Sequence, residues 1–112
     1  MDARDLVRAA TEARDRAHAP YSRYRVGAAV LTRSGRIVSG ANVENASYGL
    51  TVCAERVALW NAVTQGEREL VALAVVTEHG AAPCGACRQV LHELAPSARV
   101  FLVALAGTIR EV

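Results

Sequence analysis

Apolar positions near the start of the chain recur with a period of about 3.6 residues, which places them on one face of a helix. We therefore predict a helix over Asp2–Ala17, because positions near this period hold Leu6, Val7, Ala10, Ala13, Arg14 and Ala17. Asp2 is a suitable N-cap, because its carboxylate can accept hydrogen bonds from backbone N–H groups. The helix should end before Pro20, since proline keeps the preceding residue out of helical geometry.

Two strand-like segments follow this helix and are joined by a short polar turn. Val26–Thr32 and Ile37–Val43 are rich in apolar and β-branched residues, a composition typical of strands. Gly35 lies between them and supplies the conformational freedom that a tight turn needs. We therefore predict an antiparallel hairpin, followed by a polar loop over Asn42–Gly49.

The second half of the chain alternates between helical and strand-like patterns. Its predicted elements are a helix from near Thr51 to about Gln65, a strand over Leu70–Thr77, a helix over Cys84–Leu94 and a strand over Arg99–Leu105. The two strands are predicted to be parallel neighbours, joined by a right-handed crossover helix. We therefore expect an α/β fold, a three-layer α/β/α sandwich built on a mixed β-sheet, with both cysteine-bearing helices on one side.

Length and composition favour one compact domain over residues 1–112, because 52% of the residues are hydrophobic and 21% charged. The net charge is only +2 and the basic residues are scattered, whereas nucleic-acid binders concentrate positive charge. One Trp, three Tyr and one Phe give no ladder for base stacking. We therefore expect a small-molecule partner and no nucleic acid.

The role expected of the cysteines depends on the cellular compartment. No apolar run approaches the roughly 20 residues that span a bilayer, and the first residues lack the apolar stretch of a signal peptide. We therefore predict a cytoplasmic protein without membrane contact. Three cysteines, an odd number, in a reducing compartment favour metal binding or catalysis over a disulfide framework.

The spacing of the cysteines predicts a metal site. Cys84 and Cys87 form a C-x-x-C pair at the first turn of a predicted helix, and Cys53 lies at the start of another. The positive end of a helix dipole favours thiolates, the form that binds metal. Three thiolates suit zinc and leave its fourth position open, as a catalytic site requires.

Two charged residues next to Cys53 extend the prediction. Glu55 lies two residues beyond a proposed ligand, close enough to exchange protons with a water on the metal. Three thiolates around a divalent ion carry a net negative charge, which weakens the metal as a Lewis acid. The Arg56 guanidinium, donating to the cysteine sulfurs, would offset that charge.

Cys53-Ala-Glu followed by Pro83-Cys-x-x-Cys matches the three-cysteine form of the zinc deaminase signature. Beyond this signature the chain resembles the small homotetrameric cytidine deaminases along essentially its whole length. The matching segments are Ala19–Ser22, Val26–Ala28, Asn42–Asn45, Tyr48, Cys53–Arg56 and Pro83–Gln89.

The resemblance implies a hydrolase of pyrimidine salvage that deaminates cytidine and deoxycytidine to uridine and deoxyuridine. It implies one zinc per subunit on Cys53, Cys84 and Cys87, hydroxide attack at C4 of cytosine, and Glu55 as the proton carrier. It assigns sugar binding to Asn42 and Glu44, base contacts to the Ala54 backbone and to residue 24, and a homotetrameric assembly. Residue 24 is usually Phe in the family and is Tyr24 here. Similar enzymes continue beyond position 112 with a Leu-Leu-Pro stretch and an aromatic residue, so we expect that tail to be absent from this chain.

Other interpretations stay open at this point. The cysteines could be small core residues, and Glu55 could serve only the helix dipole. A closed structural zinc site would need a fourth ligand, for which His18 and His79 are candidates, whereas His92 lies about 12 Å along its helix from Cys84. Asn42 and Glu44 could only stabilise a turn, Arg88 could be a solvated surface charge, and Tyr48 is interpreted as a packing residue. The competing functions are deamination of a nucleoside antibiotic, deamination of a polynucleotide, and a zinc-stabilised binding module.

Overall fold

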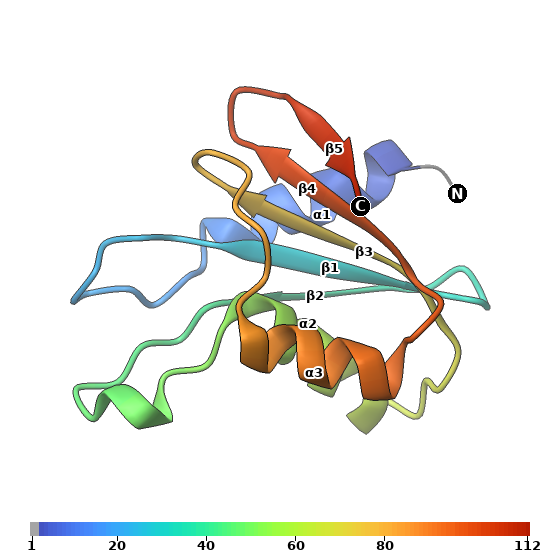
Figure 1. The fold of residues 1–112 in the computed structure, drawn as a ribbon, viewed down its shortest axis with the longest axis horizontal. Helices are drawn as coiled ribbons and strands as arrows, with labels where there is room; N and C mark the ends of the chain where they lie inside the picture. Colours follow the sequence, from blue (N-terminus) through green and yellow to red (C-terminus); the bar gives the residue numbers. More distant parts are fainter. Residues whose placement is uncertain (1–2) are drawn as a thin grey trace.

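Five strands form one mixed sheet in the order β2-β1-β3-β4-β5 (Figure 1) in the computed structural model, which describes residues 3–112. The strands are β1 (Gly27–Thr32), β2 (Ile37–Ala41), β3 (Leu70–Thr77), β4 (Arg99–Ala104) and β5 (Ile109–Glu111). β3 and β4 are parallel, and every other neighbouring pair is antiparallel. The predicted hairpin and the predicted parallel pair are both confirmed.

The helices cover the two faces of this sheet unequally. They are α1 (Ala3–Arg14), α2 (Ala54–Thr64) and α3 (Gly85–Leu94), with a short 3-10 helix η1 (Tyr48–Leu50) before α2. α1 lies on one face, whereas α2 and α3 lie together on the other (Figure 1). The predicted three-layer α/β/α sandwich is therefore confirmed, with the two cysteine-bearing helices on one side.

Alternation of side chains along the central strand produces two cores, one on each face of the sheet. In β3, Leu73 and Val75 pack towards α2 and α3, whereas Ala74 and Val76 pack towards α1. This follows from the two-residue period of a strand. The sheet is thus buried on both faces, as its near-continuous apolar strands indicated.

Some boundaries differ from the sequence prediction. Asp2, the predicted N-cap, lies outside the described residues. α1 ends at Arg14 instead of Ala17, because the chain turns there and His18 forms a β-bridge with Val43. The sequence did not predict β5, which pairs antiparallel with β4; an ion pair between Arg99 and Glu111, with N–O distances of 2.7 and 2.9 Å, also joins the two strands. No helix within residues 3–112 has the length and apolar character needed to cross a membrane.

Candidate metal centre and adjoining pocket

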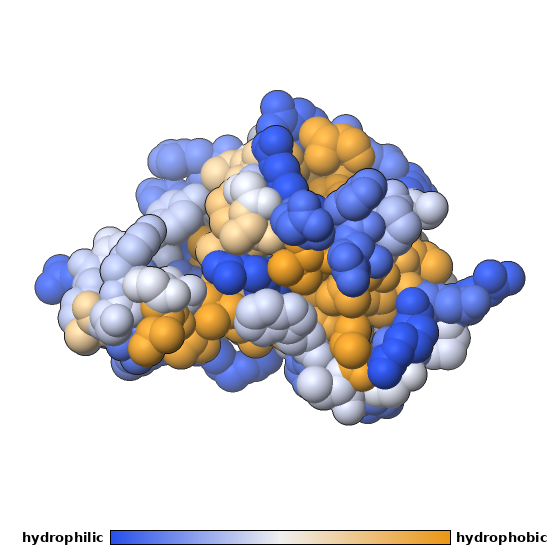
Figure 2. Space-filling view, turned by 60° about the horizontal axis from the view of Figure 1, so that its bottom comes forward, coloured by the Kyte–Doolittle hydropathy of each residue, from blue (hydrophilic) through white to orange (hydrophobic). Residues whose placement is uncertain are grey.

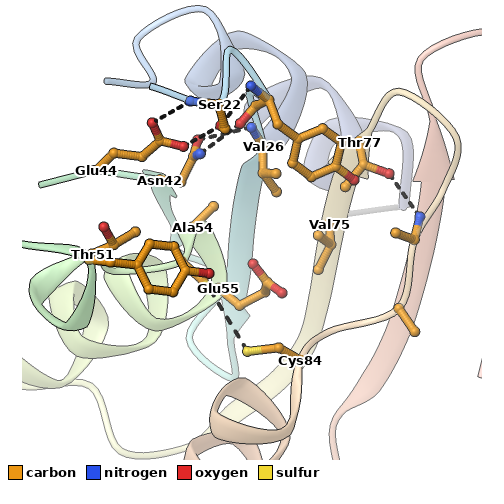
Figure 3. Close-up of a pocket in the computed structure, with 15 residues that line it drawn as sticks. Ser22, Val26, Asn42, Glu44, Thr51, Ala54, Glu55, Val75, Thr77 and Cys84 are labelled. Carbon is orange, nitrogen blue, oxygen red and sulfur yellow. Dashed lines mark hydrogen bonds between the residues drawn. The ribbon is translucent and has the colours of Figure 1, made fainter. Parts of the chain in front are cut away.

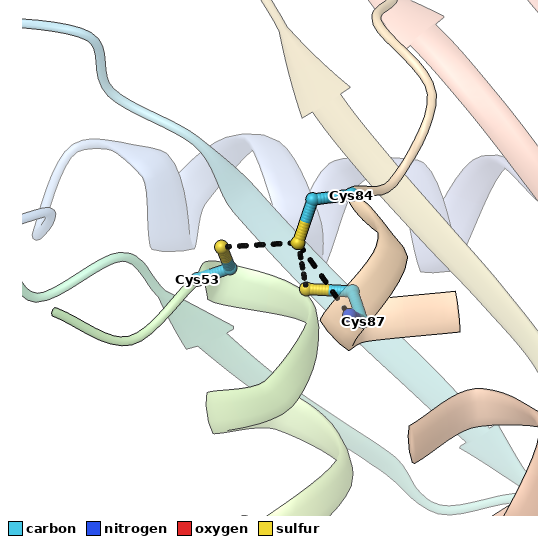
Figure 4. A group of neighbouring side chains, drawn as sticks. All are labelled: Cys53, Cys84 and Cys87. Atoms are coloured by element: carbon cyan, nitrogen blue, oxygen red, sulfur yellow. Dashed lines mark hydrogen bonds between the residues drawn. The ribbon is translucent and has the colours of Figure 1, made fainter. Parts of the chain in front are cut away.

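Three cysteine sulfurs gather where the N-termini of α2 and α3 meet (Figure 4). Cys53 is the N-cap of α2, Cys84 is the N-cap of α3, and Cys87 lies in the first turn of α3. The Cys53 and Cys84 sulfurs are 3.8 Å apart, and those of Cys84 and Cys87 are 3.4 Å apart. The convergence of three thiols from two helix starts, predicted from spacing, is confirmed.

The donor set fits a zinc ion. Zinc–sulfur bonds of about 2.3 Å in tetrahedral geometry place neighbouring sulfurs about 3.8 Å apart, which is close to the observed separations. Within residues 3–112 the group holds only these three cysteines, so no histidine or carboxylate joins it. Among the described residues, the geometry leaves a fourth position free of protein ligands, as an open catalytic site requires.

The protonation of the cluster shows how strongly these sulfurs interact. Hydrogen bonding from Cys87, together with Arg56, lowers the pKa of Cys53 to about 5. The pKa of Cys87 is raised because its thiol donates to Cys53 and is buried. Like charges this close cannot all exist without compensation. A divalent cation would supply that compensation.

Glu55 lies in the first turn of α2, and its side chain extends into the pocket near Cys84 (Figure 3). The residue is only 6% exposed. Burial raises the pKa of its carboxyl group, and the negative charge of Cys53 acts in the same direction. A carboxyl group with a raised pKa can both accept and return a proton near neutral pH.

Arg56 lies behind the cysteines instead of facing the pocket. Its Nη2 donates to the Cys53 sulfur at 3.5 Å, and its guanidinium lies 5.9 Å from the centre of the Trp60 ring. Its Nε is buried without a hydrogen-bond partner among the described residues. The predicted contact between this guanidinium and a cysteine sulfur is present.

A cavity of about 290 Å³ opens in front of Cys53, Cys84 and Glu55. Of the residues predicted to bind substrate, Tyr24, Asn42, Glu44 and Ala54 all line it. Asn42 is buried, and its amide spans two backbone groups: Oδ1 accepts from the Val26 N–H at 3.0 Å and Nδ2 donates to the Tyr24 carbonyl at 2.8 Å. This pairing holds the segment before β1 against the end of β2.

Glu44 faces the same cavity from the loop after β2 (Figure 3). Its Oε1 accepts from the backbone N–H groups of Tyr21 and Ser22, each at 3.1 Å, and its Oε2 accepts from the Ser22 hydroxyl. These bonds, the Ser22 hydroxyl first, lower the pKa of the Glu44 carboxyl group. The carboxylate is therefore ionised and already oriented in the free protein.

The sequence prediction missed several residues of the pocket and misplaced one. Tyr48, predicted to be a packing residue, is 87% exposed and lines the cavity. Arg88 is not simply a solvated charge, because its Nε donates to the Pro83 carbonyl next to Cys84 at 3.0 Å. The additional lining residues carry small apolar or hydroxyl side chains; they are Ser22, Val26, Thr51, Val75, Thr77, Ala81 and Ala82.

Comparison with known proteins decides the family. The sequence pattern described as "Cytidine and deoxycytidylate deaminase zinc-binding region" matches residues 1–103 of this chain. The chain belongs to this family. The expected zinc-binding deaminase fold, with zinc as cofactor, is thereby confirmed.

Individual relatives within the family agree with this assignment. A cytidine deaminase of Halalkalibacterium halodurans is 52% identical over 100% of this chain and 87% of its own length. The crystal structure of cytidine deaminase from Burkholderia pseudomallei superposes with a TM-score of 0.97 at 51% identity, covering 100% of this chain and 92% of that one. A blasticidin-S deaminase of Bacillus cereus is more distant, with 30% identity over 72% of this chain and 65% of its own.

Proposed function

We propose that this protein hydrolyses cytidine and deoxycytidine to uridine and deoxyuridine, with release of ammonia, in pyrimidine salvage. The observation that carries this proposal is the three-cysteine cluster at the edge of a pocket that also holds a buried glutamate. The pocket is concave, largely apolar and furnished with a few polar groups, as small-molecule sites are. The high identity to cytidine deaminases over the whole chain supports the choice of nucleoside.

Glu55 moves the protons of the reaction. Cys53, Cys84 and Cys87 would hold a zinc ion, which when bound would supply Lewis acidity that lowers the pKa of a water molecule. Glu55 accepts the proton of that water as its oxygen bonds to C4 of cytosine, and donates it to the ring N3. Glu55 then takes the proton of the hydroxyl group now on C4 and donates it to the amine, so that C4=O forms, the C4–N bond breaks and ammonia leaves.

The walls of the pocket orient the nucleoside. Glu44 and Asn42 lie at the end of the pocket remote from the cysteines (Figure 3), where they would receive the sugar hydroxyls. The backbone of Ala54, at the start of α2, would contact the base beside Glu55. Tyr24 would pack its ring beside the base. Arg56 would offset the charge of the thiolates from behind, through its bond to Cys53.

The assembly we propose is a homotetramer of single-domain subunits, one zinc in each. Large apolar or aromatic side chains remain exposed, among them Tyr21, Tyr48 and Leu50, and Tyr48 lines the pocket. The face that carries α2 and α3 also shows apolar areas (Figure 2), and Trp60 is half-exposed there. Burial of such side chains against neighbouring subunits would stabilise the assembly.

The three free thiols favour a reducing compartment, the cytoplasm.

The test combines metal analysis with product analysis on the same preparation. We expect about one zinc per chain, and conversion of cytidine and deoxycytidine with one ammonia released per nucleoside consumed. Blasticidin S and short single-stranded RNA and DNA oligomers serve as competing substrates at equal concentration. Absence of cytidine turnover in zinc-loaded protein, or faster turnover of any competing substrate, contradicts the proposal.

A further inference from the structure

One side chain that the proposed reaction does not use links two residues of the pocket. The hydroxyl of Ser22 donates to Oε2 of Glu44 and accepts from the Tyr24 N–H, the latter at 2.9 Å. The Ser22 backbone N–H also donates to Glu44 Oε1. Ser22 therefore binds both Glu44, whose carboxylate is proposed to receive the sugar, and Tyr24, whose ring is proposed to pack beside the base.

The backbone around Ser22 needs this support. Arg23 has a φ of 60°. No other non-glycine residue within 3–112 has a positive φ. An L-residue in this region is unfavourable, because its Cβ approaches the carbonyl oxygen. The Ser22 hydroxyl bridges across Arg23 to the Tyr24 N–H, and Asn42 holds the Tyr24 carbonyl on the other side.

The same bonds leave Glu44 with a restricted choice of partners. An ionised carboxylate offers about four acceptor directions. The Tyr21 N–H, the Ser22 N–H and the Ser22 hydroxyl occupy three of them. Oε1 accepts two of these bonds and Oε2 accepts only the one from the Ser22 hydroxyl, so one acceptor direction on Oε2 remains open. The orientation of that open direction depends on the Ser22 side chain, because its hydroxyl binds the same oxygen.

We propose that Ser22 is a positioning residue for the sugar: its hydroxyl fixes the Glu44 carboxylate so that one acceptor direction meets a ribose hydroxyl. The inference rests on the proposed nucleoside function and adds a residue to it. Ser22 does not contact the reacting atoms, so its effect is confined to binding. Asn42 still holds the Tyr24 carbonyl when the Ser22 hydroxyl is lost, so the loss should weaken only those ligands whose sugar carries a hydroxyl for Glu44.

The variants are Ser22→Ala, which removes the hydroxyl, and Ser22→Thr, which keeps it. Ser97→Ala is the matched control, because Ser97 is exposed in the turn between α3 and β4. The ligands are cytidine and 2′,3′-dideoxycytidine, which lacks the 2′ and 3′ hydroxyls. Thermal unfolding and zinc content check that each variant is folded and loaded.

For Ser22→Ala we expect a KM for cytidine raised about tenfold, the size of one lost charge-assisted hydrogen bond. The kcat on saturating cytidine and the kcat/KM on dideoxycytidine should stay within about twofold of the unsubstituted protein. Ser22→Thr should restore the KM, and Ser97→Ala should not change it. An unchanged KM for cytidine, or an equal loss on both nucleosides, overturns the inference.

Binding of the product keeps this test separate from that of the proposed function. Calorimetry with uridine and 2′,3′-dideoxyuridine needs no turnover, and Ser22→Ala should weaken only uridine. If the protein binds uridine but does not deaminate cytidine, the proposed activity fails while the role of Ser22 is still decided. If the unsubstituted protein binds no pyrimidine nucleoside, both proposals are overturned.

Discussion

The sulfur of Cys53 lies 3.8 Å from the sulfur of Cys84, although 31 residues separate them along the chain. Each is the N-cap of its own helix, so the positive ends of α2 and α3 point at the same place. This arrangement brings anions together and compensates part of their charge with backbone dipoles. It is a geometry suited to holding a cation, and a metal bound there would join the two helices.

Replacement of one ligand should cost both metal and stability. Cys87→Ala removes the buried sulfur of the cluster. The two thiols that remain are not enough to bind zinc tightly. We expect zinc content to fall to a small fraction of the unsubstituted value, and the thermal unfolding midpoint to fall because metal binding and folding are linked. Metal analysis and a melting curve with and without a chelator measure this.

The matched control for this experiment is His92→Ala, on the same helix. His92 is exposed, and the metal-ligating group within residues 3–112 does not include it. The variant should keep its zinc. Loss of zinc from His92→Ala as well would show that zinc loss in Cys87→Ala reflects damage to α3 and not removal of a ligand.

Loss of the Glu55 carboxylate should abolish turnover while the metal stays bound. Glu55→Gln keeps the size of the side chain but cannot carry a proton, and general acid–base groups contribute about 10²- to 10⁴-fold to rates. Zinc content should be unchanged, because Glu55 is not among the three clustered ligands. Glu93→Gln, an exposed carboxylate on α3, is the control and should keep full activity. A Glu55→Gln variant as fast as the unsubstituted protein would refute the assigned role.

Local sequence signals located the metal cluster correctly because helix starts are encoded locally. Cys53, Cys84 and Cys87 each fall at the first turn of a helix, and capping and apolar periodicity define those turns. The strand order was not accessible in this way. That β1 lies between β2 and β3 depends on contacts between distant segments.

The elements that were missed have no local signal of their own. β5 is only three residues long, and it is a strand because its backbone pairs with β4, a segment that the three residues themselves do not specify. Ser22 and Thr77 act through single hydroxyl groups, which no periodicity identifies. Tyr48 was predicted to be a packing residue, whereas it is exposed and borders the pocket.

Close packing of α2 on β2 should make Gly40 intolerant of a side chain. A Cβ at Gly40 would lie 2.5 Å from the Ala58 nitrogen and 2.9 Å from Val57, atoms of the helix that begins with Cys53 and Glu55. Gly40→Ala should therefore destabilise the protein by about 1–3 kcal/mol or more. The shifted α2 should also weaken zinc binding. Gly49→Ala, where a Cβ meets nothing within 4 Å, is the control, and denaturant unfolding of both variants measures the difference.

The loop that leads from β3 to Cys84 depends on one buried hydroxyl. Thr77 Oγ1 accepts from the N–H groups of Gly80 and Ala81 at 2.7 and 2.8 Å. Thr77→Val keeps the shape but leaves both donors without this acceptor, at a cost of about 1–3 kcal/mol for each group that stays buried. Thr64→Val, exposed near the end of α2, should cost much less. Equal unfolding free energies for the two variants would contradict this account of the loop.

Removal of the Arg56 charge should make zinc retention fail at a higher pH. Protons compete with zinc for thiolates, and the pKa of Cys53 is lowered to about 5 by its bonds from Cys87 and Arg56. Without the guanidinium that pKa rises, so protonation begins to displace the metal earlier as the pH falls. An opposite charge at this range is worth about one pH unit or more. Arg56→Ala should shift the midpoint of zinc release upward by that amount, and Arg56→Lys by less, because lysine keeps the charge without the fixed donor fork.

Arg33→Ala, which removes an exposed arginine paired with Glu69, is the control and should leave the pH midpoint of zinc release unchanged. Titration of zinc release with a chromogenic chelator decides it, and a midpoint that stays unchanged or moves downward in Arg56→Ala would show that the arginine does not stabilise the thiolates.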